Sequence, residues 1–273
     1  MHILQWLPFI GLTNFRDVCV LGRTSVSILL RLRFRTLIRF FFGPYDGEAC
    51  ALLEETSAVV CDAGSLWMVA YPCVWLPADI SIICPKGCAI LFHSLMRRMG
   101  YNGRVEIEDF GTTRPTSSIT AYSLTEVRIN IIDSADEHIF PSALDCRLSS
   151  HMNVAGMDGI VVFYPLLTLW RRYVKALGEM EGEKIDVPEG MVNMASSDGV
   201  VGGKCNRSCS KANRRVHDLE GALCIRWNVD GQGARRLRQC ASICHYSFHL
   251  GGVCENNGCQ YDVKSDPWVT RGI

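Results

Sequence analysis

Cysteine residues are concentrated at the C-terminal end of this chain. The last 69 residues contain seven of the fourteen cysteines, and the much longer remainder contains the other seven. Such density in a short segment is typical of a disulfide framework in an oxidising compartment, or of metal ligands in the cytosol. The sequence therefore predicts that residues 205–273 form a cysteine-rich module that is distinct from the rest of the chain.

Within this module the cysteines follow the spacing Cys240-x3-Cys244-x9-Cys254-x4-Cys259. On a helix, the first two sulfurs would lie one turn apart on the same face and could reach one neighbouring strand. The glycine pair before Cys254 permits a tight turn out of that helix. These features predict a helix joined to a hairpin. Disulfides worth about 2–4 kcal/mol each would stabilise a segment too small for a sufficient core.

These residues resemble the arthropod defensins, the bee type most closely, which have the cysteine-stabilised αβ fold. The resemblance covers residues 224–272 and depends on the cysteine spacing, the glycine pair and a polar end that contains Trp268. It implies disulfides Cys224–Cys254 and Cys240–Cys259. The family's closing Cys-x-Cys is replaced here by Cys259-Gln260-Tyr261, so the resemblance leaves Cys244 without its usual partner.

By the same resemblance, the chain is expected to be a secreted host-defence protein whose C-terminal module acts on microbial membranes. It implies no catalysis, no cofactor and no small-molecule substrate. Membrane contact is assigned to basic residues that precede and enter the expected helix: Arg235, Arg236 and Arg238. The stretch from residue 216 to the end carries about six basic and six acidic side chains, so attraction to anionic lipid would be largely cancelled.

The same residues allow a second interpretation, in which the chain is an intracellular zinc-binding or protein-interaction protein. Zinc takes four tetrahedral Cys or His ligands, although the usual Cys-x2-Cys knuckle is absent from this sequence. The candidate ligands are Cys240, Cys244, His249 and Cys254, with His245 and Cys259 as further possibilities.

Three regions precede the module. Residues 1–43 form a basic apolar segment, in which Arg31, Arg33, Arg35 and Arg39 stand among Leu, Ile and Phe. This segment could lie on a membrane surface, or it could be a buried helix with exposed arginines. Residues 44–177 are expected to be a poorly specified α+β region, because prolines interrupt its apolar runs. Residues 178–204 are acidic and then rich in Gly and Ser, which is typical of a linker.

Hydrophobic pattern and turn residues predict several elements within an α+β fold. Gly43-Pro44 should end the basic segment, and residues 89–99 should form a short helix. Alternation predicts strands at residues 105–108 and 127–131, with a loop at residues 112–118 between them. The two apolar runs at residues 58–84 and 159–170 should be buried strands with turns, the second leading into a helix.

Charge and motifs exclude some classes of function. The formal net charge is zero, so no global field attracts nucleic acid. Neither Gly-x-Ser-x-Gly nor His-Glu-x-x-His occurs, and an enzyme is not expected. The polar cluster Asp133, Asp136, Glu137 and His138 could hold a hard cation, but a solvated turn is favoured. A dibasic Arg214-Arg215 pair upstream of the module is a candidate processing site.

Overall fold

The computed structural model describes most of the first 173 residues and a smaller part of the remainder. The described residues are 4, 7–70, 76–101, 115–124, 127–146, 148–173, 191–193, 214–216, 219, 222–227, 236–242, 244 and 246–248. Helices and a mixed sheet are both present in this part of the chain, which confirms the α+β class.

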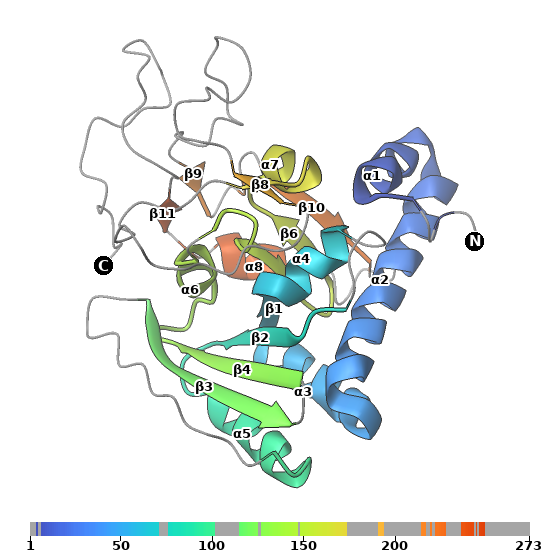
Figure 1. The fold of residues 1–273 in the computed structure, drawn as a ribbon. Coiled ribbons are helices and arrows are strands. Elements are labelled where there is room, and N and C mark those ends of the chain that lie inside the picture. The colour runs from blue at the N-terminus through green and yellow to red at the C-terminus, as the bar shows by residue number, and fades with distance from the viewer. Residues whose placement is uncertain are drawn as a thin grey trace.

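A seven-stranded sheet forms the centre of the molecule (Figure 1). Only β2 and β4 are parallel neighbours, and the other adjacent strands in this sheet are antiparallel. In spatial order the strands are β10 (Leu223–Arg226), β6 (Gly159–Val162), β5 (Asn153–Ala155), β1 (Val59–Cys61), β2 (Asp79–Cys84), β4 (Val127–Ser134) and β3 (Thr116–Leu124).

Two short pairs of strands lie outside this sheet. β7 (Arg172–Tyr173) pairs in parallel with β8 (Val192–Asn193), and β9 (Arg214–Arg215) pairs in antiparallel with β11 (Ser247–Phe248). The second pair joins the candidate processing site to the segment that follows the last helix. Within the described residues, β11 follows α8 but pairs with β9, which precedes α8. The predicted hairpin would instead pair strands that both follow the helix.

The basic apolar segment forms two helices, α1 (Phe9–Val18) and α2 (Val20–Phe42). Cys19 separates them, and its sulfur accepts a hydrogen bond from the backbone N–H of Gly22 at 3.3 Å. α2 ends where predicted, because Gly43 adopts a φ of 53°, which glycine reaches without a steric penalty. A short 3-10 turn, η2 (Gly43–Tyr45), then leads into α3 (Asp46–Thr56).

Five further helices cover the sheet. Their bounds are α4 (Asp62–Ala70), α5 (Ala89–Arg98), α6 (Phe140–Leu144), α7 (Pro165–Leu169) and α8 (Arg236–Ser242). A first core lies on one face of the sheet, where residues from α2, α3, α4 and α5 pack on strand residues such as Val60 and Ile82. α6 and α8 contribute to a second core on the other face, with Val59 and Val161.

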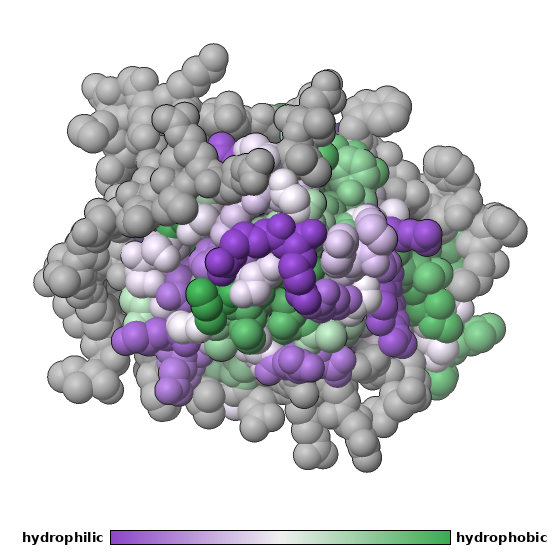
Figure 2. Space-filling view, turned by 90° about the horizontal axis from the view of Figure 1, so that it is seen from below, coloured by the Kyte–Doolittle hydropathy of each residue, from purple (hydrophilic) through white to green (hydrophobic). Residues whose placement is uncertain are grey.

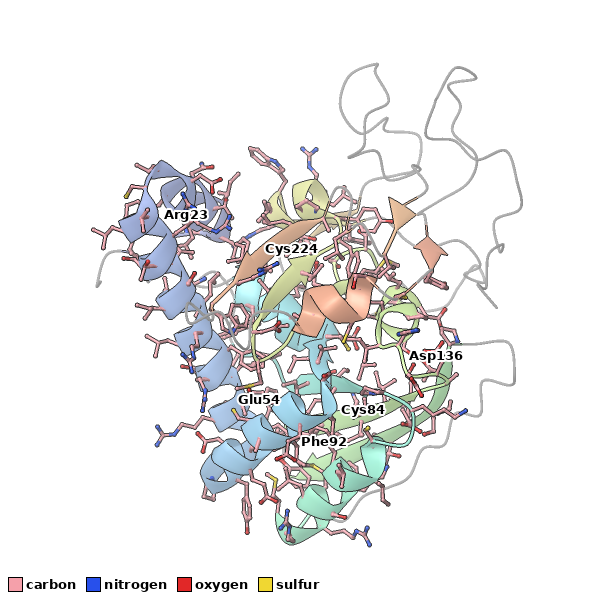
Figure 3. The ribbon with its side chains drawn as sticks, turned by 180° about the vertical axis from the view of Figure 1, so that it is seen from behind. Arg23, Glu54, Cys84, Phe92, Asp136 and Cys224 are labelled. Atoms are coloured by element: carbon pink, nitrogen blue, oxygen red, sulfur yellow. The ribbon has the colours of Figure 1, made fainter. Side chains whose placement is uncertain are left out.

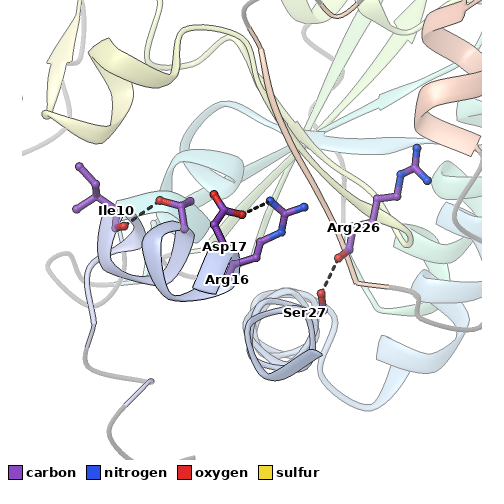
Figure 4. A network of polar contacts seen from close by, with 6 residues as sticks. Ile10, Arg16, Asp17, Ser27 and Arg226 are labelled. Atoms are coloured by element: carbon purple, nitrogen blue, oxygen red, sulfur yellow. Dashed lines mark hydrogen bonds and ion pairs between the residues drawn. The ribbon is translucent and has the colours of Figure 1, made fainter. Parts of the chain in front are cut away.

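The tail joins the body of the protein through the edge of the sheet. β10 pairs with β6 over four residues, and the side chain of Ser27 in α2 donates to the carbonyl oxygen of Arg226 at 2.8 Å (Figure 4). The next residue, Trp227, is buried and packs on Phe34 with ring centroids 5.7 Å apart. These contacts place Cys224 in the same sheet as the N-terminal region, although the sequence assigned it to a distinct module.

A carboxylate also holds α8 against the sheet. Asp158 lies between β5 and β6, and its Oδ2 accepts a hydrogen bond from the backbone N–H of Leu237 at 3.1 Å. Negative charge in the first turn of a helix is favourable because the N-terminal N–H groups are unpaired there. The linker predicted at residues 178–204 lies outside the described residues except for 191–193, so the boundary after residue 204 stays a prediction.

Other elements agree with the sequence pattern in most places, but part of the run at residues 58–84, predicted as buried strands with turns, forms the helix α4. α5 matches the helix predicted at residues 89–99, and β4 contains the strand predicted at 127–131. β6 followed by α7 confirms the strand and helix predicted in residues 159–170. The loop predicted up to Ser118 is wrong in its last part, because β3 begins at Thr116 and pairs with β4. The strand predicted at 105–108 lies outside the described residues.

The N-terminal region carries more of the core than its weak periodicity indicated. β1 and β6 are buried along their whole length and show no apolar and polar alternation, whereas β2 begins with the alternating residues Asp79, Ile80, Ser81 and Ile82 although most of it is buried. Most arginines of the basic segment are exposed and one face of its long helix is buried, while its contact with a membrane surface stays a prediction. In the part of the chain that the structure describes, no helix combines the length and apolar content needed to cross a bilayer.

Candidate functional site

The cysteines of the predicted module lie on different elements of the fold. Cys224 is in β10 (Figure 3) and Cys240 is in α8, while Cys244 is two residues beyond the end of that helix. Cys254 and Cys259 lie outside the described residues. No disulfide joins two described cysteines, and the pairs Cys224–Cys254 and Cys240–Cys259 stay predictions.

Cys244 is buried in the second core rather than displayed on the helix. α8 ends at Ser242, and the backbone N–H of Cys244 donates to the carbonyl oxygen of Ala241 at 3.0 Å. Burial raises the pKa of the Cys244 thiol, and the nearby Asp136 and Cys240 raise it further, against a backbone hydrogen bond with Tyr246 that lowers it. A protonated, buried thiol packs as a small apolar group.

The zinc and membrane-contact predictions depend on residues that are only partly described. His245, His249, Cys254 and Cys259 lie outside the described residues, and no group of three His, Cys, Asp or Glu residues within the described part is arranged to hold a metal ion. Arg236 and Arg238 are in α8, but the structure describes only their backbone, and Arg235 lies outside the described residues. Both assignments stay predictions.

The acidic cluster after β4 makes local contacts of the kind expected for a turn. Asp133 accepts hydrogen bonds from the backbone N–H of Gly87 at 3.1 Å and from the hydroxyl of Ser117 at 3.2 Å. Asp136 is exposed and accepts from the backbone N–H of His138. Both carboxylates therefore stabilise the connections between strands, in agreement with the favoured interpretation as a solvated turn.

A different group of polar residues lies where β1 turns into α4. Asp62 follows Cys61 directly and has a φ of 50°, which is uncommon for any residue other than glycine. Gly64 lies in the first turn of α4, and a Cβ there would be 2.7 Å from Cγ1 of Val60 and 3.1 Å from Cγ1 of Ile80. Glycine thus lets α4 lie close to the sheet, and the sharp turn presents Asp62 at the end of β1.

Three small polar side chains form a row across the sheet beside Asp62. The register pairs Cys61 of β1 with Ser81 of β2, and Ser81 with Asn130 of β4. The side-chain amide of Asn130 donates to the Ser81 hydroxyl at 3.2 Å and its carbonyl oxygen accepts from Nε of Arg128 at 2.9 Å. Asp79 and Arg128 form the next pair along β2 and β4. These side chains lie on the sheet face opposite α4 and α5, because the alternate residues Ile80, Ile82, Ile129 and Ile131 belong to the first core.

Two thiols converge on the carboxylate of Asp62. The Sγ of Cys146, which follows α6, donates to Oδ1 at 3.2 Å, and the Sγ of Cys61 lies 3.6 Å from Oδ2. Burial raises the pKa of both thiols well above the ordinary range, and the negative charge of Asp62 raises it further. Both cysteines therefore stay protonated at neutral pH and serve as hydrogen-bond donors to Asp62 rather than as nucleophiles.

Asp79 is the second carboxylate of this group. Burial raises the pKa of Asp79, and the neighbouring charge of Asp62 raises it further, while His151 and Arg128 act in the opposite direction. Nε2 of His151 is buried and has no hydrogen-bond partner among the described residues. An unsatisfied buried nitrogen close enough to Asp79 to affect the pKa of that carboxyl indicates a place where a bound molecule or water completes the hydrogen bonding.

Sequence reasoning missed this group, which we call the Asp62–Asp79 site. Its members come from β1, β2, β4 and the segments around α6 and β5, and Asp62 and Cys146 are 84 positions apart in the chain. The only local signal is an apolar strand followed by Cys61-Asp-Ala-Gly-Ser65, which is a tight strand-to-helix turn. Comparisons of the sequence with models of known protein families and with curated proteins found no match.

Proposed function

We propose that the Asp62–Asp79 site binds a magnesium-bound nucleotide without catalysing a reaction on it. The observation that carries this proposal is the combination of a strained strand-to-helix turn with a second carboxylate at the same end of the sheet. Strained backbone of this kind is found at functional sites more often than elsewhere.

The helix N-terminus supports phosphate binding. The first backbone N–H groups of a helix have no partner within the helix and carry partial positive charge, so phosphate groups bind there. Gly64 lets α4 pack tightly against the sheet, which fixes the position of these N–H groups at the end of β1. Arg128, which pairs with Asp79 across β2 and β4, supplies positive charge close to that carboxylate. This end of the sheet therefore offers both the donors and the charge that a phosphate needs.

The two carboxylates are suitable ligands for a magnesium ion. Magnesium is usually held by one or two carboxylates together with the phosphates of the ligand, and not by a complete cage of protein side chains. Asp62 and Asp79 meet this description, and the described residues contain no group that would hold a metal ion alone. Burial and then the charge of Asp62 raise the pKa of Asp79, and a bound ion would offset the second of these causes.

The row Cys61, Ser81 and Asn130 supports binding rather than chemistry. Two-metal phosphoryl transfer requires further anionic ligands on the reacting phosphate, and this row contains neutral side chains at the positions beside Asp79. Asn130, which is only partly buried, can instead hydrogen-bond to a hydroxyl group of a ribose. The expectation that the chain is not an enzyme is consistent with this proposal.

Calorimetric titration with ATP, GTP, CTP and UTP, each with and without magnesium, tests the proposal. We expect binding of at least one nucleotide only when magnesium is present, and a loss of at least about tenfold in affinity for Asp79→Asn, since a charged contact contributes roughly 1.5–3 kcal/mol. Glu55→Gln removes an exposed carboxylate from α3 and should leave affinity unchanged. Equal affinity of Asp79→Asn and the unchanged chain would exclude this site.

The pH dependence of stability gives an independent measurement on the same variant. Because the folded pKa of Asp79 is raised, the folded chain binds this proton more tightly than the unfolded chain. The free energy of unfolding should therefore fall as the pH rises from the ordinary Asp range through the raised pKa. Asp79→Asn should lack this fall and be more stable than the unchanged chain at pH 7. Urea titrations at pH 3 and pH 7 measure both effects, and a variant less stable at pH 7 would contradict them.

Host defence through the tail is the second candidate function. A helix is present where the defensin resemblance places one, and α8 carries Cys240 while the neighbouring strand β10 carries Cys224. Proteolysis of unreduced protein followed by mass spectrometry should yield linked Cys224–Cys254 and Cys240–Cys259 peptides. Free alkylation of these four cysteines, or protection by zinc alone, would exclude the defensin-like framework.

A further inference from the structure

The long helix α2 has a buried apolar face and an outer face on which exposed Leu and Ile side chains stand among arginines. Its inner face packs in the first core through Leu30, Phe34, Leu37 and Phe41. Its outer face is exposed to solvent along the side of the molecule (Figure 1). A surface helix of a globular protein normally has a polar outer face, so the outer face of α2 requires an explanation.

The exposed residues of α2 fall on one stripe. With 3.6 residues per turn, positions 21, 28, 32, 35 and 39 lie almost in line, and position 31 is beside them. The stripe is about 27 Å long at a rise of about 1.5 Å per residue. It consists of Leu21, Ile28, Arg31, Leu32, Arg35 and Arg39, all of them exposed.

Apolar side chains are strongly exposed on this stripe. Leu21 is 72%, Leu32 52% and Ile28 40% exposed, and Val18 and Val20 add 74% and 72% at its N-terminal end. Single exposed apolar residues are common on proteins, but three on one stripe of a helix, with two exposed valines near its N-terminal end, are more than isolated cases. On the side of the molecule where α2 lies, Figure 2 shows hydrophobic and hydrophilic residues next to one another.

The charge of the helix has one sign. α2 contains five arginines and neither Asp nor Glu. Arg33 is buried and donates to the carbonyl oxygen of Leu7, whereas Arg31, Arg35, Arg39 and, on another side of the helix, Arg23 (Figure 3) are exposed. Burial raises the pKa of the Cys50 thiol in α3, and Arg35 is close enough to that thiol to act in the opposite direction. Arg31 and Arg39 are thus the cations of the stripe best suited to an external partner.

We infer that the outer face of α2 binds the surface of an anionic lipid bilayer. Arginine side chains reach phosphate head groups while their stems lie along apolar surface, and leucine and isoleucine enter the boundary between head groups and acyl chains. A nucleic acid would use the arginines but would leave the exposed Leu and Ile side chains in water. The alternation of both kinds of residue on one stripe therefore favours a bilayer, and the neutral net charge makes the attraction local to α2.

This inference is independent of the Asp62–Asp79 site. The stripe faces away from the sheet, whereas the site lies at the ends of β1, β2 and β4. Binding to lipid and binding to nucleotide can therefore be measured separately. Failure of either leaves the other unaffected.

Co-sedimentation of the full chain with vesicles tests the inference. We expect binding to phosphatidylcholine vesicles that contain phosphatidylserine, no binding to phosphatidylcholine alone, and release by added salt. The double variant Arg31→Gln/Arg39→Gln should bind roughly thirtyfold more weakly, because each basic residue near the surface contributes about a factor of five. The matched double variant Arg97→Gln/Arg172→Gln removes two exposed arginines from α5 and β7 and should bind as the unchanged chain does.

A third variant tests the apolar contribution. Leu21→Gln/Leu32→Gln keeps every charge and should also weaken binding, although these exposed positions should leave the thermal unfolding midpoint nearly unchanged. No sedimentation with anionic vesicles would overturn the inference. Equal losses in the two arginine variants, or equal binding to neutral and anionic vesicles, would also overturn it.

Discussion

Replacing Trp227 by alanine is expected to lower the free energy of unfolding by about 3–5 kcal/mol. Trp227 is only 2% exposed, lies directly after β10 and contacts the ring of Phe34 in α2. Its indole Nε1 also donates to the carbonyl oxygen of Met157 at 3.0 Å. The substitution leaves a large cavity between the tail and the N-terminal helices and removes the donor of that hydrogen bond.

Urea unfolding followed by circular dichroism measures this loss, with Trp170→Ala as the matched control. Trp170 is 62% exposed, so its removal should change the free energy of unfolding by less than about 0.5 kcal/mol. Hydrogen exchange should show additional loss of protection in β10 for Trp227→Ala. Equal stabilities of the two variants would mean that the tail does not contribute to the stability of the body, as expected for an independent module.

The substitution Gly159→Ala is expected to destabilise the same junction by about 1–3 kcal/mol. Gly159 begins β6 opposite Arg226, and a Cβ at this position would lie 2.6 Å from the carbonyl oxygen of Ile225. The contact is with backbone, so no side-chain rotation relieves it. β10 must move away from β6, which weakens their hydrogen bonds.

Gly47→Ala is the matched control because it adds the same methyl group in open space. Gly47 lies in α3, and an added Cβ there meets no atom within 4 Å. Alanine is the better helix former, so the control should raise the free energy of unfolding by up to about 1 kcal/mol. Opposite signs for the two substitutions are the expected result in thermal unfolding. A Gly159→Ala variant as stable as Gly47→Ala would contradict the observed pairing of β10 with β6.

Elements that depend on neighbours in the sequence were predictable. In α5, Ala89, Phe92, Leu95 and Met96 recur with helical spacing and are the residues that the structure buries. Gly43-Pro44 ends α2 because glycine permits the conformation that stops the helix. The α+β class followed from such local signals, since each depends on a few adjacent residues.

The sheet order and the Asp62–Asp79 site were decided by tertiary structure. Strands pair through backbone groups that nearly all residues share, so the sequence did not show that Leu223–Arg226 pairs with Gly159–Val162. Cys224 was therefore assigned to a separate module. In the same way, the spacing of Asp62, Asp79 and Cys146 along the chain does not show that the fold brings these residues into one site. Composition determined that the tail is rich in cysteine and that α2 is basic. Tertiary packing, which removes apolar surface from water, decided that β10 completes the sheet. It also decided which face of α2 is buried and which is exposed to solvent.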